Sequence, residues 1–179
     1  EVYSFKDNST FDLFNKIINT DKMFLLNEHY RCHPHIIDFS NQEFYEGLLN
    51  IKTENTEGEY FGISAINVKG RVFYEKGRSR SASNSSEADF VIEFLLNNFE
   101  EISNKTIGVI TPFRRQKELL KRKISKVISN CNDERQKEFL EQITIGTVHV
   151  FQGDECDIIL FSSVLAAGVN EGSIKWVNE

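Results

Sequence analysis

The chain has 179 residues, of which 40% are hydrophobic and 27% are charged, and these values are typical of one globular domain. Its formal net charge of −6 argues against a protein that coats nucleic acid through charge alone, and no apolar run approaches the roughly 20 residues that cross a membrane. The odd number of widely spaced cysteines (Cys32, Cys131 and Cys156) argues against a disulfide framework and predicts a cytoplasmic protein.

The first part of the chain predicts a leading segment, a strand and a helix. Residues 1–20 form the leading segment, which opens without an initiator methionine, so we expect a fragment of a longer protein. Residues 23–26 are a short apolar run that predicts a buried strand. Pro34 suits the first turn of a helix, and Gly47 lies near its expected end. One face of this helix is predicted to contain Ile37, Phe44 and Leu48.

The rest of the chain alternates strands and helices. Residues 77–86 are poor in apolar side chains and are predicted to form a mobile loop. Asn84 and Glu87 have the spacing of a capping box at the start of the next helix. Further strands are predicted at 107–111, 143–148 and 158–161, and further helices at 113–127 and 133–142. The last strand is apolar on both faces, as a central parallel strand is, and no regular pattern follows residue 166. This alternation predicts an α/β fold with a mostly parallel central sheet flanked by helices.

A first polar segment follows the strand predicted at residues 23–26. In open parallel sheets, ligands bind beyond the carboxyl ends of the strands. Arg31 lies between this strand and a helix started by proline, a position from which a guanidinium can reach and stabilise a phosphate. Tyr30 beside it offers a flat face for a nucleobase. Composition alone favours the alternative, in which the arginine pairs with a local carboxylate and the tyrosine lies half in the core.

A second polar segment follows the strand predicted at residues 107–111. The start of the next helix offers unpaired N–H groups and a positive dipole end, which both suit a phosphate. Thr111 and Gln116 add hydrogen-bond donors, and Arg114 adds a positive charge. The basic run continues along the helix, where a solvated face is at least as good an interpretation. Its further members are Lys117, Lys121, Arg122, Lys123 and Lys126.

A third polar segment lies between the last two predicted strands. Thr147 and His149 carry donors that suit a phosphate backbone. Gly153 lets the backbone approach a ligand closely, and Glu155 can accept hydrogen bonds from ribose hydroxyls.

Two metal sites are alternatives for these segments, and we expect neither. Three carboxylates that precede a buried strand suggest a metal-dependent nuclease, but they are more often a solvated turn. A zinc site near residue 33 is disfavoured because its spacing matches no standard ligand pattern. The two sets are Asp154, Glu155 and Asp157 for the nuclease, and Cys32, His33 and His35 for zinc.

The three segments together resemble those of superfamily 1 helicases, in the branch of the nonsense-mediated-decay and Okazaki-fragment-processing helicases. Residues 26–34 are similar to that branch's L-x-x-x-Y-R-M-H-P, residues 110–116 to its I-T-P-Y-x-x-Q, and residues 147–155 to its T-V-D-x-F-Q-G-x-E. Residues 84–88 resemble its N-x-x-E-A helix start. The matches lie in the family's order and span most of the chain. The resemblance implies that residues 1–179 are a second RecA-like motor domain, with a three-layer fold, in which residues 166–179 stop before the family's final Arg-bearing motif.

The resemblance also implies a role for each site residue. Arg31 would contact the γ-phosphate of an ATP that, with its Mg²⁺, is held mainly by the N-terminal RecA-like domain of the same protein. Tyr30 would pack near the base, and Gly153 and Glu155 would border the nucleotide. The residues implied to grip single-stranded DNA or RNA are Thr111, Arg114, Thr147 and His149, with Gln152 between the two sites.

The chain departs from the family pattern at two points. His149 replaces the aspartate that is common in this branch. The sequence contains no G-x-x-x-x-G-K-[ST], so nothing in it can cradle a triphosphate, and we predict that the chain alone neither hydrolyses ATP nor unwinds duplexes. The alternative function is a helicase-derived module that binds nucleic acid or protein without turnover.

Overall fold

The computed structural model describes residues 9–18, 24–53, 62–75 and 78–178. The chain forms two compact units, Glu1–Ala65 and Ile66–Glu179. The prediction that residues 1–179 form a single domain stays a prediction. No helix in the described ranges has the length and the apolar character that a membrane span requires.

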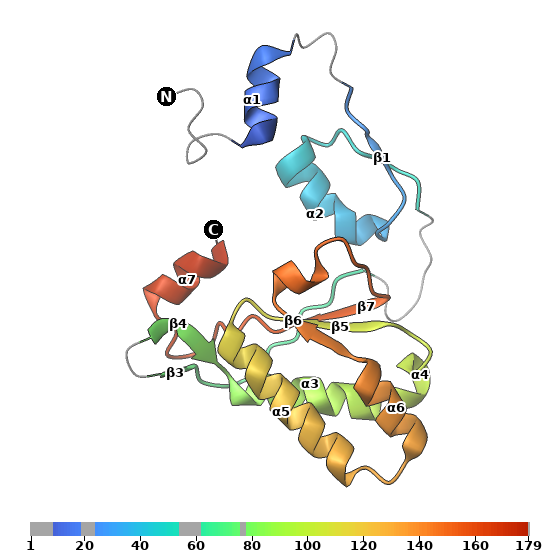
Figure 1. The fold of residues 1–179 in the computed structure, drawn as a ribbon, viewed down its shortest axis with the longest axis vertical. Helices are drawn as coiled ribbons and strands as arrows, with labels where there is room; N and C mark the ends of the chain where they lie inside the picture. Colours follow the sequence, from blue (N-terminus) through green and yellow to red (C-terminus); the bar gives the residue numbers. More distant parts are fainter. Residues whose placement is uncertain (1–8, 19–23, 54–61, 76–77, 179) are drawn as a thin grey trace. The chain divides into compact units, whose positions relative to one another are not determined.

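The first unit contains two helices and a short parallel pair of strands (Figure 1). Its elements are α1 (Thr10–Ile17), β1 (Glu28–His29), α2 (Pro34–Tyr45) and β2 (Asn50–Ile51). The strand predicted at residues 23–26 is wrong, because residues 24–27 are irregular and Met23 lies outside the described residues. The strand begins at Glu28, where pairing with Asn50 of β2 supplies the hydrogen bonds that local apolar content does not predict.

Helix α2 begins and ends where the sequence predicts. Pro34 occupies its first turn, and the side chain of His33 accepts a hydrogen bond from the backbone N–H of His35. At the other end Gly47 adopts a φ of 75° and donates from its backbone to the carbonyl of Asn41. Glycine adopts a left-handed φ with little strain, whereas the C-cap residue before it, Glu46, adopts a φ of 53° at some cost. Phe44 is exposed, as is Leu48, so the predicted face is not buried within this unit.

The second unit is built on a parallel sheet in the order β6-β5-β7, with β5 (Ile107–Ile110) between β6 (Thr144–Gly146) and β7 (Ile158–Phe161). Helices α3, α5 and α6 lie along one face of this sheet (Figure 1). The α/β class with parallel strands flanked by helices is confirmed. Strand β7, predicted as central, is instead an edge strand among the described residues, because β5 alone has partners on both sides. The helices are α3 (Ser85–Asn97), α4 (Phe99–Ile102), α5 (Arg114–Asn130) and α6 (Glu134–Gln142).

Alternate residues of β5 point to opposite faces of the sheet. Ile107 and Val109 are buried in the core that the helices cover. Gly108 points to the other face, where a Cβ would lie 2.6 Å from the ring of Phe151 and 3.2 Å from Cys156 Sγ. Glycine therefore lets the connection from β6 to β7 cross this face closely.

A hairpin occupies part of the segment predicted as a mobile loop at residues 77–86. Strand β3 (Phe73–Glu75) pairs antiparallel with β4 (Arg78–Ser83), and helix α3 begins at Ser85. The loop prediction is therefore wrong for residues 78–86, while Gly77 lies outside the described residues. Composition gave the wrong prediction because strand β4 is stabilised by pairing with β3 and by the burial of Ala82, and both depend on residues distant in the sequence.

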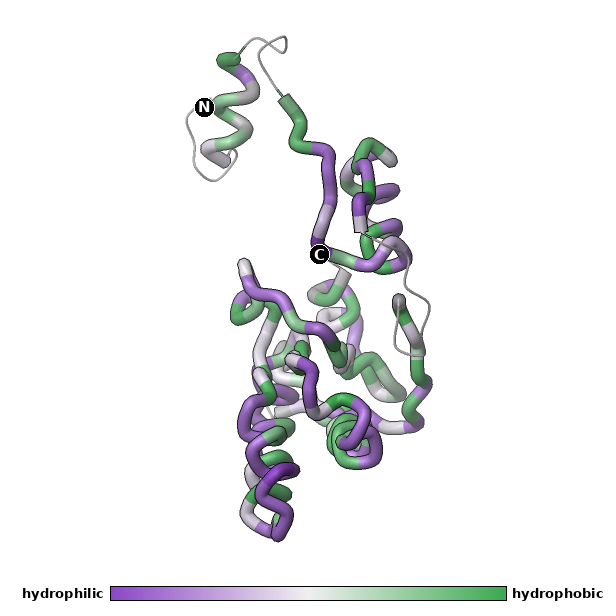
Figure 2. The backbone as a smooth tube through the Cα atoms, turned by 90° about the vertical axis from the view of Figure 1, so that its right-hand side faces the viewer, coloured by the Kyte–Doolittle hydropathy of each residue, from purple (hydrophilic) through white to green (hydrophobic). Residues whose placement is uncertain are grey.

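Two further segments differ from the predicted elements. The strand expected to reach Val148 ends at Gly146, and a 3₁₀ helix, η2 (Val148–Phe151), follows. Residues after 166, where no pattern was expected, include helix α7 (Glu171–Asn178). The tube view shows that hydrophilic residues predominate along the hairpin of α5 and α6, at the bottom of Figure 2.

Candidate functional site

The loop between β1 and α2 holds Tyr30 and Arg31 in the first unit. Both backbone polar groups of the next residue, Cys32, make hydrogen bonds to side chains. Its N–H donates to Nε2 of His29 at 2.8 Å, and its carbonyl accepts from the hydroxyl of Thr53 at 2.7 Å. The backbone that carries Arg31 is therefore set by two neighbouring side chains, which the motif comparison does not identify.

Tyr30 presents its ring to solvent while its hydroxyl is anchored. The side chain is 67% exposed, and its hydroxyl donates to Oε2 of Glu28 at 2.6 Å. This hydrogen bond raises the pKa of Tyr30, and it is also the main cause of a lowered pKa at Glu28, with the positive charge of Lys52 adding to it. Arg31, next in the chain, is exposed as well. An accessible aromatic face beside a guanidinium suits a base and a phosphate.

The carboxyl edge of the sheet brings together two of the predicted polar segments. The backbone N–H of Thr111 donates to the carbonyl of Gly146 at 3.1 Å, so the end of β5 lies against the end of β6. Thr147 follows Gly146 and is half-buried, and Arg114 opens α5 with an exposed side chain. His149 is exposed in η2, one residue beyond Val148. The predicted strand-contacting residues other than Thr111 are thus accessible near one edge.

Thr111 itself requires a correction. Its side chain has no exposed surface, and its hydroxyl accepts a hydrogen bond from the backbone N–H of Phe113. A side chain so placed shapes the turn into α5 and does not reach a bound strand. Gln116 is also fully buried, so it is not the ligand donor that the sequence predicted.

The first turn of α5 keeps features that suit a phosphate. Phe113 occupies the position before the helix and offers no side-chain cap to its N–H groups. Arg115, in the same turn, has a buried Nη1 that finds no hydrogen-bond partner among the described residues. Uncapped backbone N–H groups, a helix dipole and a guanidinium with one nitrogen that lacks an acceptor all favour an anion at this point.

The connection from β6 to β7 runs from the carboxyl edge of the sheet to its amino edge. Gln152 and Gly153 lie exposed in its turn, and Gly153 has a φ of 90°. A Cβ at Gly153 would meet nothing within 4 Å, so glycine is required by the backbone conformation and leaves the backbone open to approach. The amino edge carries the remaining site residue, Glu155, which is exposed.

A pocket of about 240 Å³ lies at this amino edge. Its lining includes Glu155, the rings of Phe139 and Phe151, and Lys105. Small-molecule sites usually measure about 300–1,000 Å³. The volume of this pocket is below that range.

The residues of the two metal alternatives are used in other ways. No group of three or more His, Cys, Asp or Glu side chains is placed to hold a metal ion in the described part of the chain. The Asp157 carboxylate accepts from both the backbone N–H and the hydroxyl of Thr106, at 2.7 Å each, and these bonds lower its pKa. Burial, with the nearby carboxylates of Asp154 and Asp157, raises the pKa of the Cys156 thiol. The proposed nuclease set thus loses Asp157 to a structural role.

A buried polar network next to the carboxyl edge was not predicted from the sequence. Glu87 accepts from the side chain of Asn84, from the hydroxyl of Ser162 and from the backbone N–H of Val164. Gln116 bridges the backbone of Asn84 and the hydroxyl of Ser162. The spacing of Asn84 and Glu87 correctly indicated a helix start, since Asn84 caps α3, but Glu87 is directed to the end of β7. Only the tertiary fold brings these groups together.

Comparison with known proteins identifies the family. The model of the AAA domain family matches residues 7–177. Helicase sen1 of Schizosaccharomyces pombe is 32% identical over 157 residues, which cover 81% of this chain and 9% of that protein. Helicase SEN1 of Saccharomyces cerevisiae is 27% identical, covering 91% of this chain and 8% of that protein. The ATP-dependent helicase upf1 of S. pombe is 25% identical, covering 91% of this chain and 18% of that protein.

The chain spans less than a fifth of the length of each of these three relatives. It belongs to the AAA-domain superfamily 1 helicases, as a C-terminal RecA-like domain of the branch that includes the Sen1 and Upf1 helicases.

Proposed function

We propose that this chain is the second motor domain of an ATP-dependent helicase or translocase that moves along single-stranded DNA or RNA. In this proposal the chain supplies an arginine to the nucleotide and a grip on the strand, and a preceding RecA-like domain of the same protein supplies the rest. The short share of the relatives' length that the chain covers leaves room for that domain. The predicted cytoplasmic location stays a prediction.

On the nucleotide side, Arg31 contacts the γ-phosphate from across the cleft. Tyr30 lies near the base, and Gly153 and Glu155 border the nucleotide. The exposure of all four residues and the anchored loop around Cys32 support these roles. ATP and Mg²⁺ are held mainly by the preceding domain, because this chain has no phosphate-binding loop. When bound, ATP supplies the free energy of hydrolysis, and Arg31 stabilises charge that develops on the transferred phosphoryl group.

On the strand side, Arg114, Thr147 and His149 contact the phosphate backbone. The uncapped first turn of α5 and the meeting of the β5 and β6 ends support this role. Thr111 shapes this edge from within and is not part of the grip.

The observation that carries the proposal is the course of residues 147–157. They leave the carboxyl edge at Thr147, pass over Gly108 with Phe151, and arrive at the amino edge with Glu155. One short connection thus contains both strand-contacting and nucleotide-bordering residues, with Gln152 between them. A shift at one edge is transmitted to the other through this packed connection, which is a physical basis for coupling.

The test is ATP hydrolysis by the full-length protein, with and without single-stranded DNA and RNA. A strand should stimulate turnover, and Arg31→Ala should lower kcat on the order of 10³-fold or more, as loss of an arginine finger does. Arg31→Lys keeps the charge but loses the planar fork, so it should restore little activity. Circular dichroism of both variants checks that they remain folded.

Three results would contradict the proposal. Turnover that is equal with and without strand would remove the coupling between sites. Unchanged kcat in a folded Arg31→Ala protein would remove the trans role of the arginine. Strand binding without any ATP turnover by the full-length protein would favour the alternative, a helicase-derived binding module.

A further inference from the structure

Helix α5 concentrates positive charge in an acidic chain. Its 17 residues include seven Lys or Arg and one Glu, so the helix has a formal charge of +6. The net charge of the whole chain is −6, so all the other residues together carry −12. A helix whose charge opposes that of the rest of the chain is a candidate contact for a polyanion.

The charges of α5 lie on its outer side. Gln116, Leu120 and Ile124 form the buried side that faces the core. Arg114 and Lys121 are seven residues apart, two turns of helix, and therefore lie on the same side of it. We define the α5 outer face by its exposed basic residues, Arg114, Lys121, Arg122 and Lys126.

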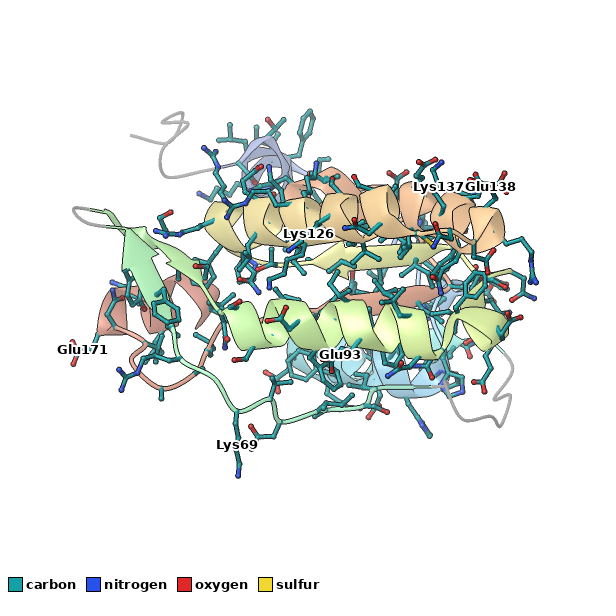
Figure 3. All side chains as sticks on the ribbon, turned by 90° about the horizontal axis from the view of Figure 1, so that it is seen from below. Lys69, Glu93, Lys126, Lys137, Glu138 and Glu171 are labelled. Atoms are coloured by element: carbon teal, nitrogen blue, oxygen red, sulfur yellow. The ribbon has the colours of Figure 1, made fainter. Side chains whose placement is uncertain are left out.

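Among the described residues, the ion pairs of α5 are made by basic residues outside this set of four. Lys123 pairs with Asp89 of α3, and Lys117 pairs with its neighbour Glu118. None of the four residues of the outer face makes an ion pair with another described residue, although α3 and α6 beside them carry Glu93 and Glu138. Figure 3 shows Lys126 on α5 and both of these glutamates on the neighbouring helices.

The composition of the face favours a phosphate backbone over a protein partner. Protein interfaces are centred on buried aromatic or apolar anchors. The other exposed positions of α5 are Glu118, Ser125, Ser129 and Asn130, and the helix has no exposed aromatic residue. Lys, Arg and Ser are the side chains that contact phosphate oxygens without reading sequence.

We propose that the α5 outer face binds the phosphate backbone of the nucleic acid beyond the grip at the carboxyl edge. This inference rests on the proposed function, because Arg114 belongs to both surfaces. From Arg114 to Arg122 the helix rises about 12 Å, so the basic residues follow a line that can lie along an extended backbone. The strand that Thr147 and His149 contact is thereby continued along α5.

The test compares two double variants of the full-length protein that remove the same amount of charge. Lys121→Gln with Arg122→Gln neutralises the middle of the face, and Lys69→Gln with Lys137→Gln is the matched control. Lys69 lies on the far side of α3 from α5, and Lys137 is on α6 (Figure 3). Fluorescence anisotropy measures the binding of labelled oligothymidylate and oligouridylate over about 50 to 200 mM salt.

Loss of two phosphate contacts should make the plot of log K against log salt shallower by about 1.4, because each contact with a single strand contributes about 0.7. The control pair should keep the wild-type slope, and both proteins should keep the wild-type melting temperature. An unchanged slope in the α5 variant overturns the inference, and strand-stimulated ATPase activity would still uphold the proposed function. Wild-type protein that binds neither oligonucleotide overturns both.

Discussion

At the scale of single residues, the backbone around Cys32 determines how Arg31 is presented. The two hydrogen bonds to Cys32 come from His29 and Thr53, which lie on either side of the loop in the sequence. Arg31 is exposed, so packing does not fix its position. In the proposed mechanism, the geometry of Arg31 at the nucleotide then depends on side chains that do not themselves touch the nucleotide.

We expect Thr53→Val in the full-length protein to lower strand-stimulated kcat about tenfold, because the loop loses one of its two anchors while the side chain keeps its volume. Thr144→Val is the control, since Thr144 is exposed on β6 and makes no side-chain hydrogen bond to a described residue. The same substitution in an Arg31→Ala background should have almost no further effect. Additive losses in the double variant would show that Thr53 acts independently of Arg31.

For Thr111, the sequence predicted the position in the fold but not the direction of the side chain. The motif placed a threonine at the end of β5, and the structure agrees, but its hydroxyl is turned inward to Phe113. Which way a side chain faces at a strand end depends on the twist and packing of the neighbouring elements. Arg114 could be predicted as accessible because a long charged side chain in a first helical turn is rarely buried.

At the scale of secondary-structure elements, Glu87 joins the start of α3 to the end of β7. Its carboxylate accepts three hydrogen bonds, one of them from the backbone of Val164. Val164 is fully buried and has a φ of 64°, which is strained for a β-branched residue. Glu87 therefore helps to hold a strained backbone in place.

Glu87→Gln should lower the free energy of unfolding by about 2–3 kcal/mol, because an amide N–H₂ would face one of the donors. Urea unfolding followed by circular dichroism measures this change. Glu93→Gln is the matched control on the same helix, where the side chain is exposed, and it should change stability by less than about 0.5 kcal/mol. Equal losses of unfolding free energy at Glu87 and Glu93 would show that the hydrogen bonds of Glu87 add nothing to the stability.

A second link between elements depends on pH. Asp157 accepts two hydrogen bonds from Thr106, which joins the starts of β7 and β5 and lowers the pKa of the carboxyl in the folded state. A depressed folded pKa gives stability that is present above the unfolded value of about 3.9 and is lost as the pH falls through the folded pKa. The difference in melting temperature between wild type and Asp157→Asn should therefore narrow as the pH is lowered from about 6 to about 2. A difference that stays constant over this range would show that the ionised carboxylate adds nothing.

The period of the hydrophobic residues correctly predicted the helices that bury one face along their length. The apolar stripes of α3 and α5 were visible because each helix buries one face against the sheet. Strand β4 was missed because its Arg and Ser residues pair with β3, and pairing partners leave no local signal. Strand β1 was displaced for the same reason, since its register is set by β2.

At the scale of the whole molecule, the positive charge and the residues expected to contact ligands are each concentrated in a short segment of the chain. Helix α5 is strongly positive within an acidic chain, and the connection at residues 147–157 contains the residues expected to contact both ligands. The sequence could predict which segments carry the chemistry, because their motifs are local. It could not predict the small pocket at the amino edge of the sheet, since that depends on the volume left between Phe139, Phe151 and Glu155.

The missing phosphate-binding loop predicts that the 179-residue chain by itself hydrolyses no ATP. Its rate of phosphate release should equal that of the buffer, with or without a single strand. The chain has Arg31, but it has no loop of backbone N–H groups and no lysine of a phosphate-binding motif. The negative charge of a bound triphosphate would therefore not be compensated. Phosphate release by the purified chain, with its fold verified by far-ultraviolet circular dichroism, measures this. An Arg31→Ala preparation serves as the control for contaminating ATPases. Turnover that is present in the wild-type chain and absent from Arg31→Ala would show that this domain contains a complete nucleotide site, and the two-domain mechanism would then be wrong.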